Sequence, residues 1–356
     1  MQEDFLQAAR AHAARWPKMQ PQDYAKLAYQ SEYGPGHLIA DEAEAAAAIR
    51  AEWEGLAAQG ETGGCRAEPI SGGLCRLHLA GPVLPDAPEC LAWLFCRSAR
   101  EHAGTPEGLC RRLETLETLR IPHMVGWLTS YRTRGMPAVR HSPIYRAAYR
   151  PHYRVLLADY AWYFPVLLAV YRLSQAGAPA LVAIDGRCGS GKSSLAALLQ
   201  RLFGCRVLHG DDFYLPPAQR APGWESRPGG NMDFARLRRE ALEPALAGRP
   251  IDYRAYSCRQ NQLLPPQRLA PAPLTVLEGS YSLHPALDTP YTLRVFLHCE
   301  PKEQARRLRE REAGYFEAFR QRWIPLEEGY FARYNIPRNC DIFLDTTGFF
   351  AAGQAP

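Results

Sequence analysis

The chain has 356 residues, of which 47% are hydrophobic and 22% are charged, and its formal net charge is +5 at pH 7. This length exceeds one average domain and suits two domains, each large enough to bury a hydrophobic core. The small positive excess fits a protein that handles anionic small molecules and does not indicate a nucleic-acid partner. The longest apolar stretch is interrupted by Asp159 and Pro165, so no membrane partner is expected.

The ten cysteines contain no Cys-x-x-Cys pair and no paired Cys/His spacing. This pattern argues against a structural zinc site and against a secreted disulfide scaffold. The first residues, Met1–Asp4, lack the basic and apolar regions of a signal peptide. We therefore expect a cytoplasmic protein with reduced thiols, and its assembly into a homo-oligomer is left open.

Residues 1–175 are predicted to form a mainly α-helical domain, because helix-type patterning dominates and alternation with a period of two is almost absent. Helices are expected over Asp41–Leu56, Pro88–His102 and Pro106–Leu119, and a Gly-rich loop over Gly60–Gly73. The segment Gln175–Pro179 has the composition of a linker, so the domain boundary is placed there. The sequence does not indicate what the helical domain does.

Residues 180–348 are predicted to form an α/β domain, because short apolar runs alternate with helical segments. Such runs are typical of parallel strands covered by helices on both faces. Strands are expected at Leu181–Ile184, Cys205–His209, Leu274–Leu277, Thr292–His298 and Ile342–Leu344. Helices are expected at Lys192–Phe203, Asp233–Leu246, Lys302–Arg311 and Tyr315–Tyr330.

The segment from Gly186 to Ser193 reads Gly-Arg-Cys-Gly-Ser-Gly-Lys-Ser, between an expected strand and an expected helix. This is the G-x-x-x-x-G-K-[ST] pattern of a loop whose backbone N–H groups surround phosphate oxygens at a helix N-terminus. Lys192 is expected to reach the β- and γ-phosphates of ATP, and the Ser193 hydroxyl to bind Mg²⁺. The expected nucleotide-binding residues are Gly186, Gly189, Ser190, Gly191, Lys192, Ser193 and Ser194.

Two carboxylates, Asp211 and Asp212, follow the second expected strand. Ligands bind at the carboxyl ends of strands in an open α/β sheet, so either carboxylate could accept a proton from an attacking hydroxyl. The alternative is that one of them only caps a turn. The next strand ends in Glu278, which could bind Mg²⁺ or substrate, although Glu-Gly is also a common strand ending.

The segment Gln304–Arg311 is an arginine-rich helix, on which Arg307 and Arg311 share one face. Arginines on a closing lid can neutralise the charge of a transferring phosphoryl group, so both residues are candidates for catalysis. The alternative is an ordinary solvated basic face.

Taken in order, the motifs Asp-Gly-x-x-Gly-Ser-Gly-Lys-Ser, Asp-Asp-Phe-Tyr, Leu-Glu-Gly and the arginine-rich helix resemble the uridine kinase-like branch of P-loop kinases. That branch includes uridine/cytidine kinase, nicotinamide riboside kinase and pantothenate kinase. The resemblance covers about half of the chain, from Ala180 to Thr346. It implies a P-loop kinase fold, with Asp211 as the base, Glu278 as the acidic strand end, and lid arginines among Arg306, Arg307, Arg309 and Arg311.

The acceptor is expected to contact Asp212, Tyr214, Asp233 and Tyr256, although Asp233 opens a helix and could be its N-cap. In the nucleoside kinases of this branch, a histidine in a Tyr-led segment reads the pyrimidine. The matching segment here, Tyr253–Asn261, has tyrosines but no histidine. The acceptor therefore remains open between a nucleoside and another small molecule with a hydroxyl group.

These features predict an ATP- and Mg²⁺-dependent kinase that transfers the γ-phosphoryl group to a hydroxyl of a small molecule. One alternative is a nucleotide-responsive binding module whose helical half engages a partner. Another is an ATPase or GTPase, which is weakened because no guanine-reading Asn-Lys-x-Asp segment is present.

Overall fold

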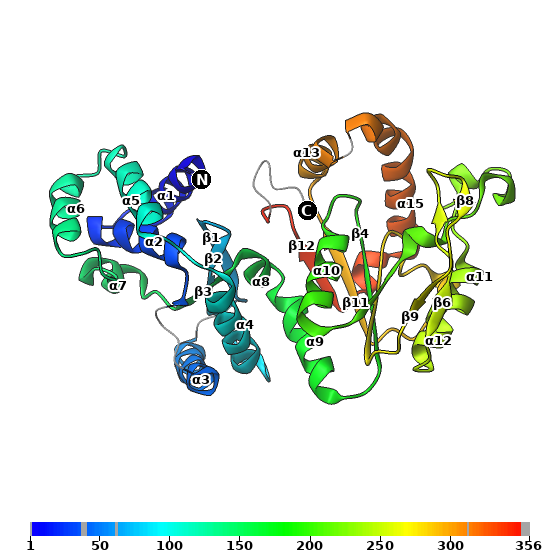
Figure 1. The fold of residues 1–356 in the computed structure, drawn as a ribbon, viewed down its shortest axis with the longest axis horizontal. Helices are drawn as coiled ribbons and strands as arrows, with labels where there is room; N and C mark the ends of the chain where they lie inside the picture. The colour runs from blue at the N-terminus through cyan, green and yellow to red at the C-terminus, as the bar shows by residue number, and fades with distance from the viewer. Residues whose placement is uncertain (1, 37–40, 61–62, 312, 350–356) are drawn as a thin grey trace. The chain divides into compact units, whose positions relative to one another are not determined.

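The computed structural model describes residues 2–36, 41–60, 63–311 and 313–349, and the chain divides into two compact units, residues 1–164 and 165–356 (Figure 1). Each unit is described by itself. All ten cysteines are free thiols. Within the described ranges, no helix has both the length and the apolar composition needed to cross a membrane.

The first unit contains eight helices in its described residues, and the three that the sequence predicts are among them. The Asp41 carboxylate caps the helix Glu42–Ala58 by accepting a hydrogen bond from the N–H of Ala43 (2.8 Å), and the Thr105 hydroxyl caps the helix Pro106–Glu117 by accepting one from the N–H of Gly108 (3.0 Å). The helices are α1 (Gln2–Arg15), α2 (Pro21–Tyr33), α3 (Glu42–Ala58), α4 (Ala87–Glu101), α5 (Pro106–Glu117), α6 (Met124–Thr133), α7 (Pro143–Tyr149) and α8 (Ala158–Trp162).

The first unit also contains an antiparallel sheet of three strands, β1 (Arg66–Ser71), β2 (Leu74–His78) and β3 (Tyr153–Leu157), in that order. The expected loop over Gly60–Gly73, of which residues 61–62 lie outside the described part of the chain, is therefore wrong at Arg66–Ser71, which form β1. Strand β2 is buried on both faces, so it lacks the alternation that marks a half-exposed strand. The turn at Gly72 and Gly73, both at positive φ, is the local signal of this hairpin.

Buried polar side chains form hydrogen bonds in the interior of this unit. Asp23 accepts hydrogen bonds from the N–H and hydroxyl of Ser142 (2.9 and 2.7 Å), and its carboxylate lies 2.8 Å from Nδ1 of His141. Nε2 of His141 lies 2.7 Å from the Tyr153 hydroxyl. Burial lowers the pKa of both His12 and His141 to about 4. Both imidazoles are therefore neutral at pH 7.

We expect the first unit to lose stability as the pH falls from about 6.5 towards 4. In that range the unfolded chain protonates His12 and His141, whereas the folded chain does not, so each proton removes up to about 1.4 kcal/mol per pH unit. Hydrogen exchange followed by mass spectrometry on peptides of the first unit measures this slope in the full chain. His141→Gln should make the slope shallower, and the exposed His123, changed to Asn, serves as the control. An unchanged slope in His141→Gln would contradict the assignment.

The second unit has a five-stranded parallel sheet, and all five strands predicted from the sequence are confirmed. The spatial order is β12-β11-β4-β10-β5, with the fully buried β4 in the centre. This strand order, with the loop after the central β4 leading into the helix Lys192–Phe203, agrees with the parallel α/β fold predicted from the sequence. The strands are β4 (Ala180–Gly186), β5 (Arg206–His209), β10 (Leu274–Glu278), β11 (Leu293–His298) and β12 (Ile342–Asp345).

Helices flank this sheet, and two short strand pairs, β6 with β9 and β7 with β8, lie outside it (Figure 1). Helix α9, which the sequence-based boundary leaves in the first domain, is grouped with the second unit. The expected helix over Asp233–Leu246 consists of two α-helical turns joined by one π turn. The helices are α9 (Phe164–Ala176), α10 (Lys192–Phe203), α11 (Phe234–Leu237), α12 (Glu243–Leu246), α13 (Pro301–Arg311), α14 (Phe316–Ala318) and α15 (Ile324–Tyr334). The short strands are β6 (Ile251–Tyr253), β7 (Tyr256–Ser257), β8 (Gln262–Leu263) and β9 (Gln267–Leu269).

Candidate functional site

The candidate site lies at the carboxyl ends of the central strands of the second unit. Strand β4 pairs with β10 on one side and with β11 on the other, and the loop that follows β4 runs directly into α10. Ligands of open α/β sheets bind at such a switch point, because the connections leave a crevice between them. In Figure 1 the helices α13 and α15 lie at the same end of the sheet as this loop.

The loop after β4 has the backbone geometry of a phosphate cradle. Gly186 has φ +141°, and a Cβ atom at this position would lie 2.1 Å from the carbonyl oxygen of Leu297, so only glycine fits. Gly191, at φ +95°, is the N-cap residue immediately before α10. The Lys192 ammonium donates hydrogen bonds to the carbonyls of Gly186 (2.8 Å) and Arg187 (3.0 Å). The loop therefore curves around the lysine at the N-terminus of a helix.

Arg307 supports this loop from behind. Its guanidinium is 1% exposed and donates hydrogen bonds to the carbonyl of Gly189 (3.1 Å) and to the hydroxyl of Thr346 (3.1 Å). Its Nε also donates to the carboxylate of Glu303 (2.8 Å). The residue does not line the cavity, and its guanidinium contacts the phosphate loop itself.

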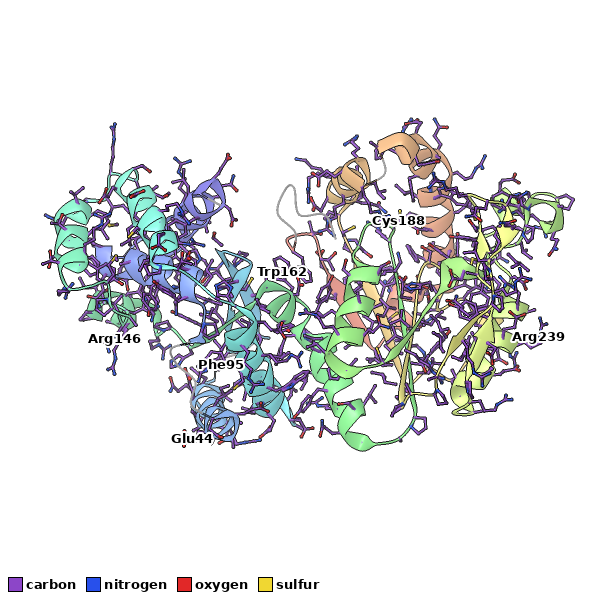
Figure 2. All side chains as sticks on the ribbon, viewed as in Figure 1. Glu44, Phe95, Arg146, Trp162, Cys188 and Arg239 are labelled. Carbon is purple, nitrogen blue, oxygen red and sulfur yellow. The ribbon has the colours of Figure 1, made fainter. Side chains whose placement is uncertain are left out.

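A second support of the loop reaches Cys188, which is labelled in Figure 2. The side-chain amide of Gln304 donates to the Cys188 carbonyl (3.0 Å), and the N–H of Cys188 donates to the carboxylate of Glu327 (3.0 Å). Helices α13 and α15 therefore both hold the middle of the loop.

Glu278 lies at the centre of a polar cluster at the end of β10. The parallel register places it beside His209 of β5, and Nδ1 of His209 lies 2.6 Å from Oε1 of Glu278. This contact raises the pKa of His209. The Ser193 hydroxyl lies 3.2 Å from both carboxylate oxygens of Glu278. A hydroxyl and a carboxylate side by side fit Mg²⁺, which binds one or two protein oxygens together with substrate phosphates.

Asp211 follows β5 and is hydrogen-bonded to Tyr214, whose hydroxyl donates to Oδ1 of Asp211 (2.8 Å). Asp211 is exposed to the cavity, but desolvation by the surrounding protein atoms raises its pKa, and this hydrogen bond opposes the shift because it favours the ionised carboxylate. Burial also raises the pKa of Tyr214 well above its ordinary value. The phenol therefore stays protonated and remains a donor to Asp211.

A cavity of about 580 Å³ joins these groups. The carboxylates of Asp211 and Glu278 and the phosphate loop share its wall, so the structure brings the expected base, metal ligands and phosphate cradle together. The predicted residues that line this cavity are Gly189, Gly191, Lys192, Ser193, Ser194, Asp211, Tyr214, Glu278 and Arg311.

The remaining predicted site residues do not line this cavity. Asp212 accepts a hydrogen bond from the Tyr253 hydroxyl (2.7 Å) and faces a second cavity of about 530 Å³. Asp233 caps α11 by accepting from the N–H of Arg236 (3.0 Å), as the capping alternative predicts, and Tyr256 is buried against Asn261. Gly186, Ser190 and Arg307 lie behind the cavity wall as parts of the loop and its support.

Glu327 is not among the site residues predicted from the sequence, but it is 4% exposed and lines the cavity. Its carboxylate accepts hydrogen bonds from the N–H of Cys188 and from the hydroxyl of Ser280. Glu327 shares the buried face of α15 with Tyr330 and Phe331, three and four residues later. A carboxylate on an otherwise apolar helix face is the signal that could have found it.

No family model matches the chain, and no curated protein matches it. Among solved structures, a possible uridine kinase from Bacillus stearothermophilus matches with 17% identity and a TM-score of 0.39, covering 50% of this chain and 99% of that one. The D-glycerate 3-kinase from Cryptococcus neoformans matches with 13% identity and a TM-score of 0.33, covering 45% of this chain and 86% of that one. We take the fold of the second unit from its own strand order and loop geometry.

Proposed function

We propose that the protein is a phosphotransferase that moves the γ-phosphoryl group of ATP to a hydroxyl group of a small molecule. The observation that carries this proposal is the single cavity that contains the phosphate loop, the Ser193–Glu278 pair and the Asp211 carboxylate. An enzyme that only hydrolyses a triphosphate needs the phosphate loop and the metal-binding pair. The additional carboxylate, which accepts a hydrogen bond from a tyrosine, can take the proton of an acceptor hydroxyl.

In this proposal the loop N–H groups and Lys192 hold the triphosphate, and Asp211 takes the proton of the acceptor hydroxyl. The acceptor oxygen forms a bond to the γ-phosphorus while the bond from that phosphorus to the bridging oxygen breaks, so ADP leaves. Ser193 and Glu278 would hold Mg²⁺, which neutralises phosphate charge when it is bound. Arg311 lines the cavity and would approach the phosphates, and Arg307 would act as a positioning residue for the loop.

The direct test incubates the full-length protein with ATP, Mg²⁺ and a metabolite pool, and mass spectrometry identifies any product that has gained a phosphoryl group. A phosphorylated product is the expected result. ATP hydrolysis without such a product would indicate an ATPase instead. Binding of ATP with neither reaction would support the nucleotide-responsive module.

The Tyr214 hydroxyl gives a pH-dependent test of Asp211 as the base. The hydrogen bond favours the ionised carboxylate, so Tyr214→Phe should raise the pKa of Asp211 further and move the acid limb of kcat to higher pH by about one unit. The pH profile of kcat at saturating ATP measures this shift. Tyr253→Phe, which removes the matching hydroxyl from Asp212, is the control and should leave the limb in place. Equal shifts in both variants would exclude this role of Tyr214.

A further inference from the structure

Arg220 is a cation in the cavity wall that is held in place but lacks an acidic partner. Its Nε donates a hydrogen bond to the carbonyl of Leu215 (2.9 Å), and its guanidinium lies over the ring of Trp224 at 4.8 Å. In the described part of the chain, no carboxylate lies within ion-pair distance of it and its two Nη groups have no hydrogen-bond acceptor. A fixed guanidinium with both Nη groups available matches the two oxygens of a carboxylate or phosphate.

Asn231 is a second polar side chain that lines the cavity without a protein partner. It is 2% exposed, and only its backbone carbonyl is engaged, accepting from the N–H of Leu215 (2.8 Å). Across residues 2–36, 41–60, 63–311 and 313–349, no hydrogen bond is found for its side-chain amide, and the amide is not among the fully enclosed unpaired groups, so it is open to the cavity. An amide that reaches the cavity without a protein partner can bind a polar group of a ligand there.

Arg220 and Asn231 both lie on the Asp211 side of the cavity, because both form hydrogen bonds with the backbone of Leu215, the residue after Tyr214. Leu215 accepts from Arg220 and donates to Asn231, and Tyr214 itself is bonded to Asp211. Arg220 and Asp211 also line the same cavity as Cys258. Arg220 and Asn231 therefore face the region where the proposed base would meet the acceptor.

Trp224, whose ring stacks against the Arg220 guanidinium, also connects the loop that carries both residues to the opposite wall of the cavity. The ring of Trp224 lies 6.1 Å from that of Trp323, which lines the cavity just before α15. This contact limits the positions that the guanidinium can take. The arginine is thus oriented before a ligand arrives, which lowers the entropic cost of binding.

We propose, resting on the phosphotransferase function above, that the acceptor carries an anionic group, a carboxylate or a phosphate ester, in addition to its hydroxyl. Arg220 binds the two oxygens of this anion, and Asn231 binds a polar group beside it. Three carboxylates line the cavity, those of Asp211, Glu278 and Glu327. An anionic acceptor would be repelled by them without a dedicated cation on its own side.

Binding can be tested without turnover, because Cys258 lines the same part of the cavity and is exposed. The rate of alkylation of Cys258 by iodoacetamide, followed by peptide mass spectrometry, is compared in the presence of glycerol, glycerate or glycerol 3-phosphate. The two anionic compounds should slow alkylation and glycerol should not. The anion that protects Cys258 more strongly shows whether the site prefers a carboxylate or a phosphate. Equal protection by all three, or protection by neither anion at millimolar concentration, would overturn the inference.

The variant Arg220→Gln should abolish the difference between the anionic and neutral compounds, whereas the exposed Arg259→Gln, outside the cavity lining, should preserve it. In the phosphorylation assay, Arg220→Gln should raise KM for the acceptor about ten- to a hundredfold and leave KM for ATP unchanged. If a neutral acceptor is phosphorylated and Arg220→Gln does not change that activity, the anionic acceptor is refuted while the proposed kinase function stands. If an anion selectively protects Cys258 but no phosphorylated product forms, the proposed kinase function is refuted while the anion-binding site stands.

Discussion

Replacing Asp211 by Asn is expected to lower kcat for phosphoryl transfer about a thousandfold, while the affinity for ATP changes by no more than a few-fold. The asparagine keeps the size of the side chain and an acceptor for the Tyr214 hydroxyl, but it cannot take a proton. The phosphate loop does not depend on Asp211 for its shape, because its hydrogen bonds come from Lys192, Arg307 and Glu327. Initial rates and nucleotide titration on the same protein sample measure the two quantities.

Asp212→Asn is the matched control for this change. Asp212 is the neighbouring carboxylate, and its partner Tyr253 is likewise a tyrosine, but Asp212 does not line the main cavity. We expect it to reduce kcat far less than Asp211→Asn does. If turnover persists in Asp211→Asn and is lost in Asp212→Asn, the base is Asp212 and the second cavity holds the acceptor.

The sequence predicted the parallel sheet well, because its strands are buried on both faces and read as continuous apolar runs. It predicted the phosphate loop for a related reason: the positions of Gly186 and Gly191 need positive φ, and their spacing is visible in the chain. Strands β1 and β2 were missed because charged residues such as Glu68 and Arg76 interrupt them, so they form neither a continuous apolar run nor a regular alternation. The sequence pattern therefore predicts those strands and loops whose structure depends on residues that are close together in the chain.

The site was predicted less completely, because contacts across the fold decide which side chains face the cavity. Asp212 and Tyr256 carry suitable chemistry, but tertiary packing turns them towards Tyr253 and Asn261. Arg220 and Asn231 belong to a loop whose path depends on contacts with Leu215, and no periodicity reveals such contacts. The acceptor side is thus the part that sequence patterns describe least.

Arg307 shows how a correct residue type can carry a different role, and its replacement is the second change with a large expected effect. Arg307→Met should destabilise the second unit by about 3 kcal/mol, because the buried guanidinium joins Gly189 and Thr346 and is paired with Glu303. Since Gly189 belongs to the phosphate loop, the affinity for ATP should fall as well, by about tenfold or more. Urea unfolding of the second unit and nucleotide titration measure the two effects.

The control is Arg309→Met, two residues further along α13, where the arginine is exposed and lies over the ring of Phe316. Its loss should cost about 0.5 kcal/mol and leave ATP binding unchanged. Thr346→Val removes the hydroxyl that accepts from Arg307 and donates to the carbonyl of Ser190 (2.9 Å), so its effect should be strongly non-additive with Arg307→Met. If the Arg307→Met protein is stable and binds ATP normally but transfers no phosphoryl group, Arg307 contacts the phosphates directly instead of supporting the loop. The combination of lost stability and lost ATP affinity is what distinguishes a residue that shapes the loop from one that touches the substrate.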